Sequence, residues 1–188
     1  MFSNLKADLE RYTRLSNKPW WYHLLLTPGV WATAQYRYCR WVHNSVHIPV
    51  LRQALKAFGF VWMKLVHLNT GICIDRAAEI GKGLFIGHFG CIFVAGKVKM
   101  GEMCNLSQGV TVGWGGRKNT KGCPTLGDRV YIGAGAKVLG KITVGSNVAI
   151  GANAVVTKDV PDNAVVVGIP ARVINYNGSK DFIDWEDD

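Results

Sequence analysis

The sequence has no long apolar run, no paired cysteine motif and few acidic residues. No window of its 188 residues approaches the ~18–20 apolar positions that a membrane-spanning helix needs. The first ten residues are polar and charged, which does not fit a secretory signal peptide. The five cysteines are odd in number and form no Cys-x-x-Cys pair, which argues against a disulfide framework or a thiolate zinc site. We therefore expect a protein of the reducing cytoplasm.

The scarcity of acids gives the chain a basic charge balance. It holds 22 Lys and Arg against 13 Asp and Glu, and five of those acids lie in residues 181–188, so residues 1–180 carry +14. Such a body favours an anionic partner, which can be nucleic acid, an acidic membrane or a phosphorylated cofactor. Nucleic acid is disfavoured because the basic residues are dispersed and no binding motif is present. Basic helices rich in Trp and Tyr leave peripheral contact with the inner face of a membrane open.

Glycine is rare at the start of the chain, where two of the 22 glycines occur within residues 1–69. Apolar residues there recur three or four positions apart, as at Trp31, Ala34, Tyr38 and Trp41, which is the spacing of an amphipathic helix. Prolines at positions 19, 28 and 49 can each start a helix, because the first helical turn needs no N–H from proline. We predict three or four helices in this region.

A six-residue repeat replaces the helical spacing from residue 70 onward. One aliphatic residue recurs at Ile74, Ile80, Ile86, Val94, Met100, Leu106, Val112, Leu126, Ile132, Val138, Val144, Ile150 and Val156. Glycine follows eight of these thirteen positions. Such a short period indicates a solenoid, in which three extended segments form one triangular coil and the aliphatic residues fill its interior. The repeat predicts roughly four coils that end at Pro161.

The repeat is interrupted twice. Ile86 and Val94 are eight residues apart, and Val112 and Leu126 are fourteen apart, which leaves an excursion at residues 114–122. A regular solenoid needs no such loops, so we expect them to carry function. These patterns divide the chain into a helical region (1–69), a β-helix domain (70–175) and an acidic tail (176–188) that we expect to be mobile.

Several motifs resemble the hexapeptide-repeat acyltransferases, in particular the serine O-acetyltransferase branch. They are residues 77–88 (AAEIGKGLFIGH), 108–113 (QGVTVG), 132–140 (IGAGAKVLG), 167–172 (VGIPAR) and the helical start at 5–9 and 28–31. The resemblance implies an α+β fold in which an N-terminal helical region precedes a left-handed parallel β-helix. It also implies a homotrimer, with a dimer of trimers left open, and acetyl-CoA as a co-substrate that lies along the groove between neighbouring coils.

His88 matches the general base of that family. An alcohol attacks a thioester efficiently only when its proton is removed, and imidazole, with a pKa of ~6.5, suits that task at neutral pH. The alternative for His88 is an exposed side chain at a coil corner. The remaining histidines are interpreted as packing or surface residues, namely His23, His43, His47 and His67. No His, Cys, Asp or Glu cluster has metal-ligand spacing, so we expect no metal.

Three acceptor-side positions depart from the family's pattern. Where the family has an acidic residue that orients the histidine, this chain has Cys73. Where the family has an acid directly before the histidine, it has Gly87. The family's Arg-His-Pro is replaced by Gly122-Cys123-Pro124. The resemblance places Cys73, Gly87 and Cys123 in the acceptor site. Asp75 can share a face with Cys73 in an extended segment, which makes it the candidate to orient His88. A covalent acyl-cysteine is disfavoured, because a lone cysteine in a coil is usually an apolar filler.

These lost charges bear on the acceptor. A free amino acid brings a carboxylate that needs a cationic or multiply hydrogen-bonded partner, and a sugar hydroxyl does not. The substituted motif also resembles the colanic-acid-type exopolysaccharide O-acetyltransferases. We therefore expect an O-acetyltransferase acting on a saccharide or polysaccharide precursor. The alternative is L-serine, in cysteine biosynthesis, with Arg117, Lys118 or Lys121 binding its carboxylate. A second alternative is a non-catalytic or membrane-surface binding protein.

The phosphates of coenzyme A suit basic side chains near the coils. The candidates are Arg117, Lys158 and Arg172. Small residues that would let the pantetheine arm approach the backbone are Gly113, Ala134 and Ala152. Trp114, at the root of the excursion, is expected to pack on the pantetheine, on a sugar ring or on a neighbouring subunit.

Overall fold

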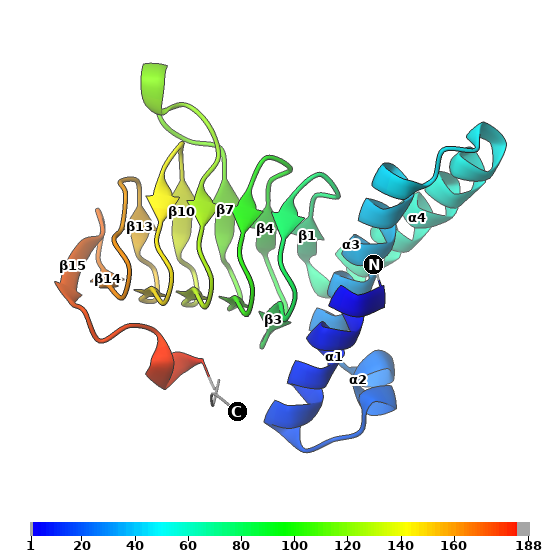
Figure 1. Ribbon diagram of the computed structural model, residues 1–188, viewed down its shortest axis with the longest axis horizontal. Helices are drawn as coiled ribbons and strands as arrows, with labels where there is room; N and C mark the ends of the chain where they lie inside the picture. The colour runs from blue at the N-terminus through cyan, green and yellow to red at the C-terminus, as the bar shows by residue number, and fades with distance from the viewer. Residues whose placement is uncertain (1, 184–188) are drawn as a thin grey trace.

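The computed structural model describes residues 2–183 and confirms the predicted fold class, with N-terminal helices followed by a parallel β-helix (Figure 1). The helices are α1 (Phe2–Ser16), α2 (Trp20–Leu26), α3 (Pro28–Ser45) and α4 (Pro49–Thr70). As expected, Pro28 and Pro49 begin α3 and α4, and Pro19 directly precedes α2. Within the described residues, no helix combines the length and hydropathy that crossing a bilayer requires.

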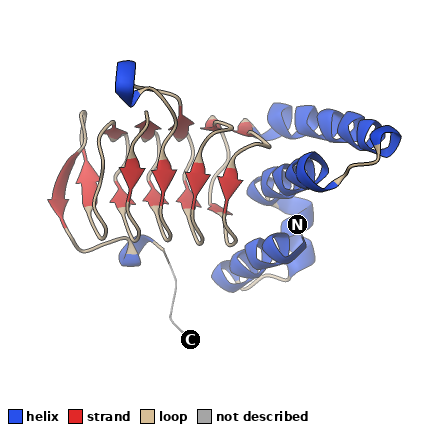
Figure 2. Ribbon diagram, turned by 45° about the horizontal axis from the view of Figure 1, so that its top comes forward, coloured by secondary structure: helices blue, strands red, loops and turns tan. Residues whose placement is uncertain are grey.

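Short strands wind into a prism with three faces, which we call A, B and C (Figure 2). Face A contains β1 (Ile72–Ile74), β4 (Ile92–Val94), β7 (Thr111–Gly113), β10 (Lys137–Leu139) and β13 (Val155–Val156). Face B contains β2 (Glu79–Ile80), β5 (Lys99–Met100), β8 (Thr125–Leu126) and β11 (Thr143–Val144). Face C contains β3 (Phe85–Ile86), β6 (Asn105–Leu106), β9 (Tyr131–Ile132), β12 (Ala149–Ile150), β14 (Val165–Val167) and β15 (Arg172–Asn175). Only the β14–β15 pair among these is antiparallel.

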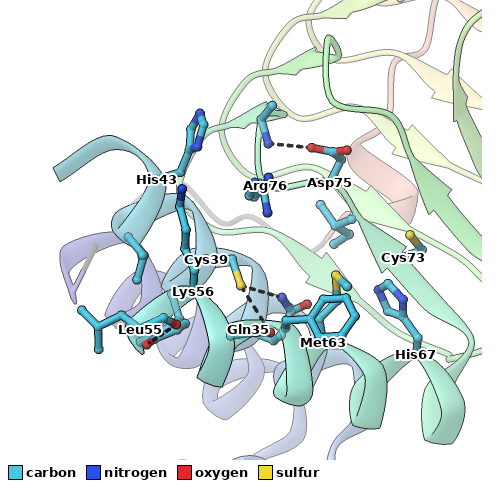
Figure 3. A pocket seen from close by; sticks show the side chains of 16 residues that line it. Gln35, Cys39, His43, Leu55, Lys56, Met63, His67, Cys73, Asp75 and Arg76 are labelled. Atoms are coloured by element: carbon cyan, nitrogen blue, oxygen red, sulfur yellow. Dashed lines mark hydrogen bonds between the residues drawn. The ribbon is translucent and has the colours of Figure 1, made fainter. Parts of the chain in front are cut away.

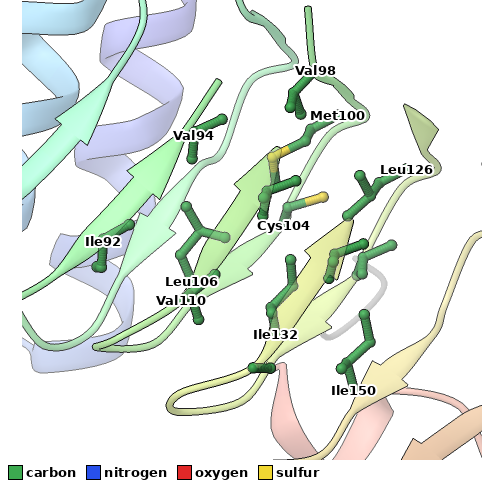
Figure 4. Packing of buried hydrophobic residues seen from close by; sticks show 14 of the residues in the cluster. Ile92, Val94, Val98, Met100, Cys104, Leu106, Val110, Leu126, Ile132 and Ile150 are labelled. Atoms are coloured by element: carbon green, nitrogen blue, oxygen red, sulfur yellow. The ribbon is translucent and has the colours of Figure 1, made fainter. Parts of the chain in front are cut away.

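The repeat forms the core of the prism. All thirteen aliphatic residues are buried, and the parallel register stacks them in columns (Figure 4). On face C, for example, Ile86 lies next to Leu106, which lies next to Ile132 in the following coil. Burying one such side chain stabilises a fold by about 1.5–3 kcal/mol. The columns therefore form a large part of the hydrophobic core of the prism.

The prism is longer than the roughly four coils that the repeat predicts, because the chain after Val156 adds β14 to face C and completes a fifth coil. The repeat was expected to end at Pro161, but β14 follows it and pairs with β12. The inward residues after Val156 are Val160 and Val166, which are four and then six positions on. This change of spacing hides the last coil from a search for a strict six-residue period.

The chain after β15 folds back on face C as far as it is described. Ser179 is fully buried, Ile183 is 1% exposed, and the Phe182 ring stacks on Tyr131 with centroids 4.9 Å apart. The rest of the predicted acidic tail, residues 184–188, lies outside the described residues.

Side chains of α1 and α3 close the open end of the prism. The first coil has no preceding coil, so its outward backbone groups need other partners. The Asp8 carboxylate accepts from Leu84 N at 2.8 Å and from Arg37 Nε at 2.9 Å, and Arg37 Nη1 donates to Ile80 O at 2.7 Å. The Tyr36 hydroxyl donates to Ala78 O at 2.8 Å. Burial raises the pKa of Asp8, although the hydrogen bond and charge of Arg37 act in the opposite direction.

Candidate functional site

His88 lies on the edge of the prism where face C turns into face A. The turns on this C–A edge are residues 87–91, 107–110, 133–136 and 151–154. Backbone hydrogen bonds link them from coil to coil: Gly109 N to Gly90 O at 2.9 Å, Gly135 N to Gln108 O at 2.8 Å, and Asn153 N to Ala134 O at 2.8 Å. The edge thus aligns His88 with two predicted donor-site residues, Ala134 and Ala152.

The turn that carries His88 is the longest on this edge. It holds two residues more than the six-residue period allows, and the backbone has a positive φ at Gly90 (106°) and Cys91 (53°). Gly87, His88 and Phe89 are all exposed. Within residues 2–183, no side chain hydrogen-bonds the imidazole, which is therefore available to a substrate. The structure places the ring on the surface, and a second wall is needed to make a cleft around it.

Other predicted residues lie on the opposite edge, where face A turns into face B. This A–B edge carries Asp75, Gly113, Trp114, Arg117, Cys123 and Lys158. The excursion projects from it, away from the prism (Figure 1). Gly115 and Gly122 close the root of the excursion by exchanging two backbone hydrogen bonds of 3.1 Å. Trp114 is 51% exposed, and Lys97 Nζ lies 5.3 Å from its ring centroid.

Asp75 and His88 are not brought together within one chain. The His88 turn contacts the start of β1, where Ile92 N donates to Gly71 O at 3.1 Å. Asp75 follows the far end of β1, which puts about 13 Å of extended chain between them. The Asp75 carboxylate instead accepts from Ala77 N at 2.8 Å. An orienting role for Asp75 is a prediction that would require its side chain to reach the imidazole of a neighbouring chain.

Cys73 and Asp75 instead share a cavity of about 350 Å³ between α3, α4 and the first coil (Figure 3). His67 also lines it, and His67 Nε2 is buried with no hydrogen-bond partner among the described residues. Burial lowers the pKa of His67 and raises that of Cys73. His88 is not part of this cavity.

Sequence reasoning missed the polar lining of this cavity. On α3 it comes from Gln35, Cys39 and His43, and on α4 from Lys56 and His67, with the apolar Met63 between those two in sequence. Members of each set recur at four- or seven-residue intervals, so each set lies on one helical face. Polar residues at helical spacing on a face that packs against the prism were the available signal.

The three predicted phosphate-binding residues lie in two separate places. Lys158 and Arg172 line the same shallow hollow at the base of the prism, and both are exposed. Arg117 lies in the excursion, adjacent to the 3₁₀ helix η1 (Lys118–Thr120). Burial raises the pKa of Cys123, as it does for Cys73, and so disfavours the reactive thiolate in both. Among the described residues, no group of three His, Cys, Asp or Glu side chains could hold a metal ion.

Comparisons with known proteins point to one enzyme family. The profile of the bacterial transferase hexapeptide family (six repeats) matches residues 123–158. A serine acetyltransferase of Helicobacter pylori is 40% identical over 171 residues, which are 91% of this chain and 94% of the relative. A serine acetyltransferase of Synechococcus elongatus is 41% identical over 157 residues, which are 84% of this chain but 61% of the relative. The chain thus spans less than two thirds of that second relative.

Solved structures give the same result for the fold. The crystal structure of serine acetyltransferase from Brucella abortus matches with a TM-score of 0.78 and 29% identity, over 94% of this chain and 69% of that one. The Neisseria gonorrhoeae serine acetyltransferase in complex with serine matches with a TM-score of 0.75 and 28% identity, over 92% and 68%. These similarities fit a left-handed winding of the prism.

Proposed function

Because the chain belongs to the serine acetyltransferase family of hexapeptide-repeat acyltransferases, we propose that it transfers an acetyl group from acetyl-CoA to a hydroxyl, with His88 as general base. The observation that carries this proposal is the C–A edge, which aligns His88 with a column of small-residue turns. An exposed imidazole at one end of such a column can meet a hydroxyl while the pantetheine arm lies along the turns.

The chemistry requires one proton acceptor and a bound thioester. The neutral imidazole of His88 removes the hydroxyl proton as the hydroxyl oxygen attacks the acetyl carbonyl. The tetrahedral intermediate then collapses with cleavage of the C–S bond, and the imidazolium returns the proton to the departing thiolate. The products are an acetyl ester and free coenzyme A. A positioned base contributes about 10²- to 10⁴-fold to such a reaction.

Acetyl-CoA would bind through groups from both edges of face A. Gly113, Ala134 and Ala152 would allow close approach of the pantetheine arm. Lys158 and Arg172, which share the hollow at the base, suit the phosphates of the adenosine end. Trp114 and Arg117 belong to the excursion on the A–B edge. They suit an acetyl-CoA molecule that is bound between two chains. A neighbouring prism would supply the second wall of the cleft, which supports a homotrimer.

We propose L-serine as the acceptor. What supports it is that the relatives named above are serine acetyltransferases, one of them solved in complex with serine. Arg117, Lys118 and Lys121 are all exposed on the excursion and could bind the carboxylate of serine. The colanic-acid-type resemblance finds no support among those relatives, so serine, the alternative of the sequence analysis, takes precedence over a saccharide.

A saccharide hydroxyl is the second candidate, because one observation favours it. The three positions where the family carries acceptor-side acids or bases hold Cys73, Gly87 and Cys123 here. A cysteine side chain is never a cation, and burial raises the pKa of both thiols, which disfavours their anionic form. A neutral polyol would need no ionic partner at these positions.

The acceptor is tested by following release of the coenzyme A thiol with a thiol reagent. With L-serine we expect saturable turnover at least about tenfold above hydrolysis, because a bound, oriented hydroxyl outcompetes water. Homoserine, D-serine and a panel of hexoses and nucleotide sugars serve as matched acceptors. Saturation with a sugar and none with serine would overturn the serine proposal while retaining acetyl transfer. No turnover with any acceptor, together with no acetyl-CoA binding, would favour the non-catalytic alternative.

The exposed side of α4 supports pairing of two trimers. Its apolar residues alternate at three and four positions, the spacing of a coiled-coil seam, at Leu51, Ala54, Phe58, Val61, Leu65 and Leu68. Leu68 is 83% exposed and Leu65 is 56% exposed. Phe58, Val61, Trp62 and Leu65 surround a small hollow, as the four residues of a knob-accepting hole do. An α4 helix of a second trimer suits this seam.

Leu65→Glu is expected to halve the particle mass measured by light scattering, from a hexamer to a trimer, because it puts a charge into the apolar seam. Gln53→Glu, exposed on the same helix but off the seam, should leave the mass unchanged. A wild-type protein that stays trimeric at all concentrations would contradict the pairing. If such a trimer also floats with anionic vesicles and Leu65→Glu does not, the seam serves the membrane contact left open by the sequence.

A further inference from the structure

The strand that leads to His88 is an edge strand. β3 is the last member of face C and pairs only with β6, to which it is joined by the hydrogen bond from Phe85 N to Cys104 O at 3.0 Å. In a parallel sheet, alternate residues bond to opposite neighbours, so the N–H and C=O of Ile86 point away from β6. Without a partner on that side, the end of β3 would be free to fray just before His88.

One hydroxyl takes the place of the missing strand. Tyr12 Oη accepts from Ile86 N at 2.8 Å and donates to Ile86 O at 3.1 Å. Tyr12 is 4% exposed, and its ring packs against Phe85 with centroids 4.6 Å apart. Burial raises the pKa of Tyr12. The hydroxyl therefore stays protonated at neutral pH and can serve as donor and acceptor at once.

The surroundings of this contact leave little room for it to move. A Cβ added at Gly29 would lie 2.5 Å from Ile86 O and 2.7 Å from Tyr12 Oη. α3 thus approaches the contact closely from a second side. The opposite end of the His88 turn is held by Gly109 N and Gly71 O, which bond to Gly90 and Ile92. The imidazole itself has no side-chain partner within the described residues, so its position depends on these backbone anchors.

We infer that Tyr12 is a positioning residue for the reaction, because it fixes the backbone two residues before His88 and so aims the imidazole at the acceptor hydroxyl. This inference rests on the proposed function of His88. It predicts that losing the Tyr12 hydroxyl impairs the proton transfer more than it impairs the binding of acetyl-CoA, whose predicted residues lie in later coils.

The structure offers a matched control in Tyr36. This residue is also fully buried in the helical region, and its hydroxyl also donates to a backbone carbonyl of the first coil, at Ala78. Ala78, however, lies between face A and face B, on the edge opposite His88. Tyr12→Phe and Tyr36→Phe therefore remove the same group from the same coil, and only the first removes it next to His88.

In Tyr12→Phe we expect kcat to fall about 10- to 100-fold, because displacing a catalytic group lowers the rate by about that factor. The KM for acetyl-CoA should change less than about twofold. Tyr36→Phe should keep kcat within about twofold of the wild type. A second readout needs no turnover: the ring resonance of His88 in a ¹H–¹³C spectrum, assigned by its loss in His88→Ala, should shift or broaden in Tyr12→Phe alone.

Equal kcat values in the two variants, with an unchanged His88 resonance, would overturn the inference. If Tyr12→Phe does not fold, Gly29→Ala perturbs the same contact from α3, and the same shift of the His88 resonance is expected, whereas an unchanged resonance would again contradict the inference. If the wild-type protein shows no acetyl transfer, the proposed function fails, and the resonance still decides whether Tyr12 positions His88.

Discussion

Replacing His88 by alanine is expected to lower acetyl transfer by about 10²- to 10⁴-fold, which is the usual contribution of a positioned general base. The binding of acetyl-CoA should change little, because the residues that suit coenzyme A lie in later coils and in the excursion. The reason is chemical: without the imidazole, the acceptor hydroxyl must lose its proton to water as it attacks the thioester. The loss should therefore fall on kcat and leave the KM for acetyl-CoA close to its wild-type value.

The measurement is initial-rate kinetics with the acceptor identified by the thiol assay, together with calorimetric titration of acetyl-CoA. His47→Ala is the matched control, because His47 is also exposed but lies in the helical region between α3 and α4. It should retain full activity. A His88→Ala enzyme with more than about a tenth of wild-type kcat would exclude His88 as the general base.

The architecture could be predicted because it follows from residues that repeat. Positions such as Leu106, Ile132 and Ile150 occupy equivalent places in successive coils, and a parallel register stacks equivalent places directly. Each new coil therefore repeats the same packing, and one period specifies many contacts. Where the period changes, as between Val156 and Val166, the prediction failed by one coil, although the packing itself continues.

The closure of the prism could not be predicted in this way. Asp8, Arg11 and Tyr12 share one face of α1, and each bonds to the backbone of residues 83–86 in β3 or just before it. In the sequence these three residues are polar positions of an amphipathic helix, the kind that normally faces solvent. Their partners are backbone groups more than 70 positions away, and no side-chain pattern marks a backbone group that lacks a strand partner.

Sequence reasoning named candidate site residues, but it did not predict where the fold places them relative to one another. Alternation along a strand allowed Cys73 and Asp75 to share a face, and the structure does place both in one cavity. That cavity lies at the A–B edge, however, whereas His88 lies at the C–A edge. Spacing within one coil shows which residues are outward, but not which edge of a second chain they would meet in the proposed trimer. That relation depends on assembly.

The second large effect concerns the buried ion pair between α1 and α3. Asp8→Ala is expected to reduce the free energy of unfolding by about 3–5 kcal/mol, the usual cost of leaving one partner of a buried pair alone. The side chains of Asp8 and Arg37 are 2% and 3% exposed. In the variant, the Arg37 guanidinium loses its counter-charge, and Leu84 N loses the acceptor 2.8 Å away. For a chain of this length, we expect the melting temperature to fall by about 10 °C.

Glu10→Ala provides the control on the same helix. Glu10 pairs with Lys6 at 3.6 Å, but their side chains are 63% and 78% exposed, so the loss should be below about 1 kcal/mol. Melting must be compared at equal protein concentration, because assembly into the proposed trimer would stabilise the folded chain. Since Asp8 and Tyr12 are one turn apart on α1, Asp8→Ala should also loosen the end of β3 and lower kcat. Equal melting temperatures for Asp8→Ala and Glu10→Ala would contradict this prediction, because they would show that the first coil is stable without the Asp8 contacts from α1.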